Sequence, residues 1–95
     1  MREVVDGKTY DVSEAKLLCR VFGGPTVVPS MGMMVTLAES VYVDSEGEYF
    51  VVETQTHLPH DRSVQQTTTQ RLKPISAREA QRQRIEAQRQ VEFGQ

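Results

Sequence analysis

The spacing of apolar residues in the N-terminal third of the chain changes from that of a strand to that of a helix. Glu3-Val4-Val5 is typical of a short strand, and Asp6-Gly7 after it is a turn dipeptide whose glycine can take a positive φ. Asp11 and Glu14 have the spacing of a capping box, and Gly23-Gly24-Pro25 is a helix stop signal. Between them, four apolar side chains recur at the spacing of one helix face: Ala15, Leu18, Cys19 and Phe22. The pattern predicts a strand followed by a helix.

The middle of the chain has the pattern of a β-hairpin. Val35–Val43 is the clearest strand, and Tyr49–Thr56 is a second one with continuous apolar residues at its start. Asp44-Ser45-Glu46-Gly47 between them is a turn with glycine in the left-handed position. We expect Thr26–Val28 to add a brief strand before this hairpin.

The methionine-rich segment before the hairpin has two interpretations. Met31, Met33 and Met34 lie close together, and methionine is flexible enough to line adaptable surfaces. One interpretation is a contact surface for a partner or for a second copy of the chain. The other is an apolar lid over a small core.

The C-terminal third predicts a loop, a polar edge strand and a second helix. We expect a loop over 57–62 and an exposed edge strand within 63–72, where charged and polar residues discourage unwanted pairing. Ser76 and Glu79 have the spacing of a second capping box, and a helix follows to about Val91. Because its apolar face is thin, we expect 76–95 to pack lightly, to project into solvent or to contact a partner.

These elements predict one α+β domain over 1–95, in the order β-α-β-β-β-α. Both helices are expected against one face of a small antiparallel sheet. A chain of 95 residues is the length of a single domain.

Composition adds a compartment and a charge asymmetry. One cysteine, no long apolar run and an early acidic residue favour a soluble protein of a reducing cytoplasm. The net charge of −2 is uneven, because residues 1–56 carry nine acids and four bases, whereas residues 57–95 carry four acids and seven bases. An acidic body with a basic tail favours protein partners over plain nucleic-acid binding, although a solvated surface can also have this distribution.

Three patterns that resemble active sites are incomplete. His57, His60 and Asp61 are too few for a closed zinc site, and Pro59 argues against a shared helix face. Cys19 lies on the predicted buried face of its helix, which disfavours a nucleophile. Gly7-Lys8-Thr9 lacks the earlier glycine of a phosphate-binding loop, since Glu3 stands there. We therefore predict no catalytic residue, no metal and no cofactor.

Two charged groups are candidates for partner contact. Asp44, Glu46 and Glu48 form an acidic edge at the hairpin turn, which is either a solvated edge or a patch that meets a basic partner. Along the last helix, Arg78, Arg82 and Arg89 share one face. They are a solvated helix face or an electrostatic contact to nucleic acid, but no aromatic residues interleave with them for base stacking.

Three motifs resemble those of small phage and mobile-element proteins. GKTYDVSEA is similar to the "G-K-x-Y-D-T-E-T-A" opening of that group, with a departure at Val12-Ser13-Glu14. The pattern of 39–50 is similar to its hairpin, which has an acid and an aromatic before a glycine turn and an aromatic after it. LKPISAREA, residues 72–80, resembles its "I-x-P-L-S-x-x-E-A" entry to the last helix.

The resemblance implies a counter-defence role, because some proteins of this kind are anti-CRISPRs. We predict a non-enzymatic inhibitor that binds a CRISPR-Cas effector in the host cytoplasm, with the acidic edge in a basic nucleic-acid groove. The alternative is a phage accessory protein that binds nucleic acid or regulates transcription through the basic helix, with Arg84 added to its arginines. A structural homodimer without inhibitory activity is a third interpretation.

Overall fold

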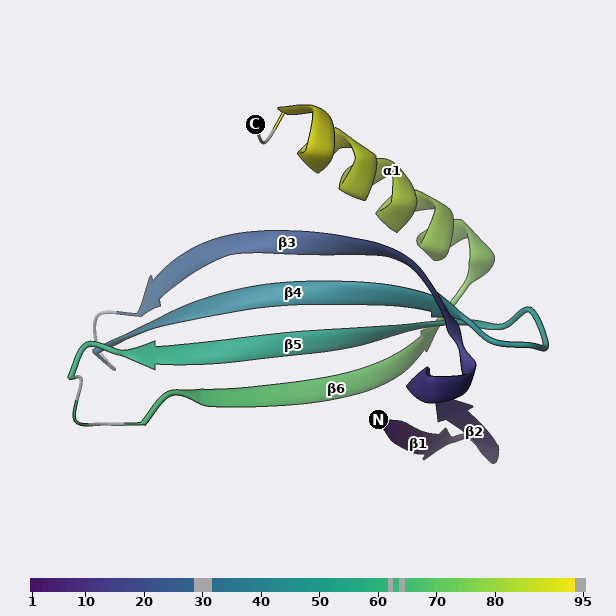
Figure 1. The fold of residues 1–95 in the computed structure, drawn as a ribbon, viewed down its shortest axis with the longest axis horizontal. Coiled ribbons are helices and arrows are strands. Elements are labelled where there is room, and N and C mark those ends of the chain that lie inside the picture. Colours follow the sequence, from purple (N-terminus) through teal and green to yellow (C-terminus); the bar gives the residue numbers. More distant parts are fainter. Residues whose placement is uncertain (29–31, 62, 64, 94–95) are drawn as a thin grey trace.

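A four-stranded antiparallel sheet with one long helix dominates the fold (Figure 1). The structure is a computed structural model and describes residues 1–28, 32–61, 63 and 65–93. A hairpin of β1 (Arg2–Val5) and β2 (Lys8–Asp11) comes first and forms its own two-stranded sheet. The larger sheet has its strands in chain order: β3 (Lys16–Val28), β4 (Met33–Val43), β5 (Tyr49–Pro59) and β6 (Thr67–Ile75). The helix α1 (Ala77–Phe93) ends the described chain. The predicted α+β class and antiparallel sheet are confirmed.

The prediction of a helix after Asp11 is wrong, and with it the element order and the helix count. Only a single 3-10 turn, η1 (Val12–Glu14), forms there, and Asp11 caps it by accepting a hydrogen bond from the Ser13 amide at 3.0 Å. The chain then enters β3, which pairs with β4 along most of its length. Long-range pairing therefore overrides a local pattern that has the spacing of a helix.

Two irregularities of β3 explain why its sequence resembles a helix. The register shifts between Leu17 and Cys19, so the consecutive residues Leu18 and Cys19 both pack on the same core cluster. In a regular strand they would point to opposite faces. A second shift covers the glycine-proline segment before Thr26, and an edge strand tolerates proline because it has no partner on one side.

The hairpin of β4 and β5 confirms the predicted turn and extends beyond the predicted strands. Gly47 has φ +79° in the turn, and β4 pairs with β5 in unbroken register from Val43–Tyr49 to Met33–Pro59. The prediction of a loop over 57–62 is wrong for residues 57–59, because β5 continues to Pro59. The predicted edge strand is β6, one of the two outer strands of the sheet.

The sheet has a small core on each of its faces. On one face, Val41 and Val51 pack with Ala80 of α1. On the other face, Phe50 and its neighbours pack with Tyr10 of the β1–β2 hairpin. Because neighbouring residues of a strand point to opposite faces, Phe50 and Val51 of the central strand β5 belong to different layers. Both are almost fully buried.

The covering layers lie over one end of the sheet. In Figure 1 the strands extend well beyond α1 and the β1–β2 hairpin, towards the end where β4 begins. Consistent with this, none of the residues from Met33 to Leu37 is fully buried. The sheet is therefore anchored near the β4–β5 turn and thinly covered at its other end.

The helix α1 begins where its capping box predicts. The Ser76 hydroxyl accepts a hydrogen bond from the Glu79 amide at 3.1 Å. Ala80 and Ala87 are buried, whereas Ile85 and Val91 are 50% and 67% exposed. A narrow alanine stripe thus holds α1 on the sheet.

Substitution of Phe50 tests the core. Its ring centroid lies 5.4 Å from that of Tyr10 and 5.3 Å from that of Tyr42. We expect Phe50→Ala to lower the free energy of unfolding by about 3–5 kcal/mol in urea titrations. Val4→Ala is the matched control at a side chain that is 68% exposed, with an expected change within about 0.5 kcal/mol. Equal losses from both variants would contradict this core.

Candidate binding surfaces

The acidic turn, residues 44–48, is built around the carboxylate of Asp44. Its Oδ1 accepts hydrogen bonds from the amides of Glu46 and Glu48, each at 2.9 Å. The backbone closes the same turn, because the Asp44 amide donates to the Glu48 carbonyl at 2.9 Å. In Figure 1 the turn projects past the end of the sheet, beside the β1–β2 hairpin. It is therefore a fixed protrusion.

Lys8 of β2 ties this turn to the β1–β2 hairpin. Its Nζ lies 2.7 Å from Oε2 of Glu46 and 3.1 Å from Oδ2 of Asp44. The hydrogen bond to Glu46 raises the pKa of Lys8 above its ordinary value, with further help from Asp44 and against partial desolvation. Lys8 is one base beside the three acids of the turn, so it neutralises part of their negative charge.

The three predicted acidic residues have different roles. The Asp44 side chain is only 14% exposed. Desolvation raises the pKa of its carboxyl, but the hydrogen bonds from Glu48, Lys8 and Glu46 together outweigh it, so the pKa lies below its usual value. Glu46 has a side chain that is 73% exposed, and Glu48 is exposed as well. Asp44 thus positions the turn, Glu46 is exposed but paired with Lys8, and Glu48 is exposed at the end of the turn.

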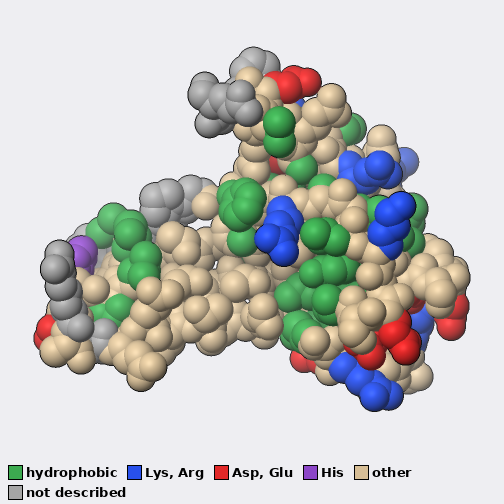
Figure 2. Space-filling view, in the orientation of Figure 1, with side chains coloured by type: hydrophobic (Ala, Val, Ile, Leu, Met, Phe, Trp, Pro, Cys, Tyr) green, Lys and Arg blue, Asp and Glu red, His purple; other side chains and the backbone are tan. Residues whose placement is uncertain are grey.

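The predicted arginine face of α1 also forms, on the side of the helix away from the sheet. At about 100° per residue, Arg78, Arg82 and Arg89 fall within about 40° of one another and opposite the alanine stripe. Basic side chains gather around α1 in Figure 2. Arg82 and Arg89 each pair with the glutamate three residues before them, at 3.1 and 3.9 Å. The two glutamates thus offset part of the positive charge of the three arginines.

Arg84 departs from the arginine face and lines a cleft between α1 and β3. The cleft has a volume of about 650 Å³. Its apolar walls include Leu18, Phe22 and Ile85, and its cations are Arg20 and Arg84. In Figure 2, hydrophobic and basic side chains meet at the surface in this region. The sequence gives no signal for this cleft, because it depends on β3 being a strand.

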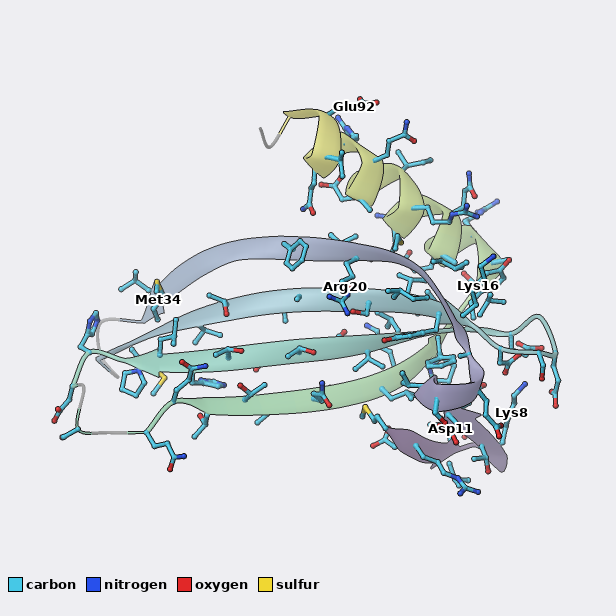
Figure 3. The ribbon with its side chains drawn as sticks, viewed as in Figure 1. Lys8, Asp11, Lys16, Arg20, Met34 and Glu92 are labelled. Carbon is cyan, nitrogen blue, oxygen red and sulfur yellow. The ribbon has the colours of Figure 1, made fainter. Side chains whose placement is uncertain are left out.

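The predicted methionine surface lies at the other end of the sheet. Met31 lies outside the described residues, whereas Met33 and Met34 are half-buried and pair with Pro59 and Leu58 of β5. Figure 3 shows Met34 at the opposite end of the sheet from Lys8. The structure therefore does not bring the methionines and the acidic turn together.

The residues with potential for chemistry are dispersed. His57 lies in β5, and His60 follows it and donates its backbone N–H to the Gly32 carbonyl at 2.9 Å. The described part of the chain holds no group of His, Cys, Asp and Glu that fits a metal ion. Burial raises the pKa of the Cys19 thiol, although Arg84 opposes this, and a raised pKa disfavours the reactive thiolate.

Comparisons with protein-family models, with curated proteins and with solved structures found no match to this chain. The resemblance to small phage proteins therefore stays a prediction from its three motifs. Within the described residues, no helix has the length and apolar character needed to span a bilayer.

Removal of the Asp44 carboxylate tests how the turn is held. Asp44→Ala leaves two amides without their acceptor, and we expect a loss of about 1–2 kcal/mol in the free energy of unfolding at pH 7. Because the pKa of Asp44 in the folded chain lies below its ordinary value of 3.8, its stabilisation is complete above that value and is lost as the pH falls through the folded pKa. Urea titrations from neutral to strongly acidic pH should show the difference from wild type shrinking.

Ser45→Ala is the control within the same turn, since Ser45 is exposed. We expect it to change stability by less than about 0.5 kcal/mol at either pH. An Asp44→Ala penalty that stays constant down to acidic pH would contradict a role for the ionised carboxylate.

Proposed function

We propose that this chain is a non-enzymatic inhibitor of a host defence complex, of the anti-CRISPR class, that binds a Cas effector. The observation that carries the proposal is the acidic turn: a protrusion held by Asp44 and Lys8, with the carboxylates of Glu46 and Glu48 exposed at its tip. The three sequence motifs supply the choice of a phage-borne protein. In this proposal the protein acts in the cytoplasm of the bacterial host.

Rigidity matters for such a contact because flexible loops lose conformational entropy when they bind. The backbone of the turn is already closed, and the side chains of Glu46 and Glu48 are exposed. A groove that binds nucleic acid is lined by Lys and Arg, so exposed carboxylates match its charge and compete with phosphates. The contact would be electrostatic and therefore weakened by salt.

The nucleic-acid alternative uses the arginine face of α1. Its arginines do share one outward face, which is what a phosphate contact requires. However, Arg82 and Arg89 are each paired with a glutamate of the same helix, and Arg84 lies on the cleft side. Ion pairs reduce the charge of both surfaces, since Glu46 is likewise paired with Lys8. We prefer the acidic turn as the contact surface because Asp44 fixes its backbone.

Charge reversal at the tip of the turn tests the proposal. Affinity capture from a phage-sensitive bacterial host with a CRISPR system should recover a stoichiometric protein partner with wild type. Glu46→Lys/Glu48→Lys places two cations opposite a basic groove, and we expect capture and inhibition of CRISPR interference to fall by about tenfold or more.

Glu3→Lys/Glu92→Lys is the matched control, with the same change in net charge at two exposed positions outside the turn. It should retain capture and inhibition. Equal losses from both double variants, or no stoichiometric partner with wild type, would refute the proposed contact. Salt-sensitive retention on DNA that disappears when Arg78, Arg82 and Arg89 become alanine would instead support the nucleic-acid alternative.

A further inference from the structure

The outer edge of β3 is a potential site of strand pairing. β3 and β6 are the two edge strands of the sheet, and β3 has 13 residues. An edge strand presents unpaired backbone N–H and C=O groups on its outer side, which can pair with another chain. Natural proteins cover or interrupt such edges. The contacts that α1 makes with β3 therefore decide which part of this edge can pair.

Gln90 of α1 closes the edge at Phe22. Its Nε2 donates a hydrogen bond to the Phe22 carbonyl at 2.7 Å, and its Oε1 accepts one from the Phe22 amide at 2.9 Å. A carboxamide has the same donor and acceptor as a peptide group. Gln90 therefore takes the place of one residue of a pairing strand. Of the side chains that the structure describes, it is the one that makes hydrogen bonds to the β3 backbone.

The rest of α1 leaves the later part of this edge open. The helix packs on β3 and, in Figure 1, runs beside the first half of that strand. β3 continues past Phe22 to Val28 without this cover. The side chains of Phe22 and Val27 are 60% and 56% exposed, which is high for large apolar residues on a strand. Apart from the register shift that contains Pro25, this part of the edge therefore offers backbone groups and two exposed apolar side chains, Phe22 and Val27, for pairing.

The charge pattern of the edge favours a second copy of the same chain. Residues 21–28 (VFGGPTVV) contain no charged side chain. Antiparallel pairing of two such segments about a two-fold axis therefore brings no like charges together and places the exposed Phe22 of one copy opposite the exposed Val27 of the other. A strand of an unrelated protein would need a similarly uncharged, apolar sequence. A second copy of this chain has that sequence by symmetry.

We propose that the β3 edge is a dimerisation surface that Gln90 holds closed. While Gln90 occupies the backbone groups of Phe22, the chain stays monomeric. When Gln90 releases them, the β3 strands of two copies pair edge to edge, and two four-stranded sheets become one continuous sheet. This pairing does not depend on the proposed inhibitor activity, since the acidic turn joins β4 to β5 and lies outside β3.

Replacement of Gln90 by a residue without hydrogen-bonding groups tests this lock. Gln90→Met keeps the side-chain length but removes both hydrogen bonds to Phe22. By sedimentation velocity, wild type should have the 10.8 kDa mass of the monomer, and Gln90→Met should shift with rising concentration to twice that mass. Gln88→Met is the control, because Gln88 bonds Glu92 on the same helix, and it should stay monomeric.

A second substitution locates the contact in the dimer. Gln90→Met/Phe22→Glu places a carboxylate opposite the apolar Val27 of the paired strand, where it loses hydration without gaining a partner, so we expect it to return to the monomer. Hydrogen exchange of wild type provides a measurement that needs no variant: the Phe22 amide should be protected. In Gln90→Met kept dilute enough to be monomeric, it should exchange about tenfold faster or more.

Each of the other outcomes overturns the proposal. A Gln90→Met chain that stays monomeric with a fast-exchanging Phe22 amide shows that the open edge does not pair. A dimer that persists with Phe22→Glu shows that the two copies are in contact elsewhere. If the chain forms heterodimers with another protein and no homodimers, the β3 edge binds that protein and not a second copy. A Phe22 amide that exchanges freely in wild type shows that Gln90 does not hold the edge closed. This outcome can be read even if the variants fail to fold.

Discussion

The fold depends on the packing of two adjacent residues of β5 on opposite faces of one sheet. Phe50 packs with Tyr10 of the β1–β2 hairpin on one face, and Val51 packs with Ala80 of α1 on the other. Both layers therefore pack on the same strand. Loss of either layer leaves one face of β5 exposed to solvent. This arrangement lets a chain of 95 residues build a stable centre from very few buried side chains.

The same packing fixes the surface that we propose to be functional. The β1–β2 hairpin, held on the sheet by Tyr10, carries Lys8 to the acidic turn, where it contacts Asp44 and Glu46. The turn directly joins β4 to β5, so the buried residues of both strands position it. Core packing and the Lys8 contacts thus together fix the position of the turn that exposes Glu46 and Glu48.

Local signals in the sequence predict the turns and the C-terminal helix, but not the partners of the strands. Gly47, the Ser76 cap and the β4–β5 hairpin follow from short-range chemistry and are confirmed. The helix predicted over β3 is wrong because a bulge lets Leu18 and Cys19 face one cluster, which imitates helical spacing. Contacts between distant residues, such as Lys8 with Asp44 or Gln90 with Phe22, depend on that topology and leave no local signal.

We propose that the acidic turn is the part of this protein that contacts a host defence complex. The most direct test is hydrogen exchange of the chain alone and in the presence of a purified Cas effector, with and without its nucleic acid. If the turn makes the contact, the amides at 44–48 exchange more slowly with the effector and lose this protection when nucleic acid already fills the groove. Protection confined to α1, or no change at the turn, would contradict it.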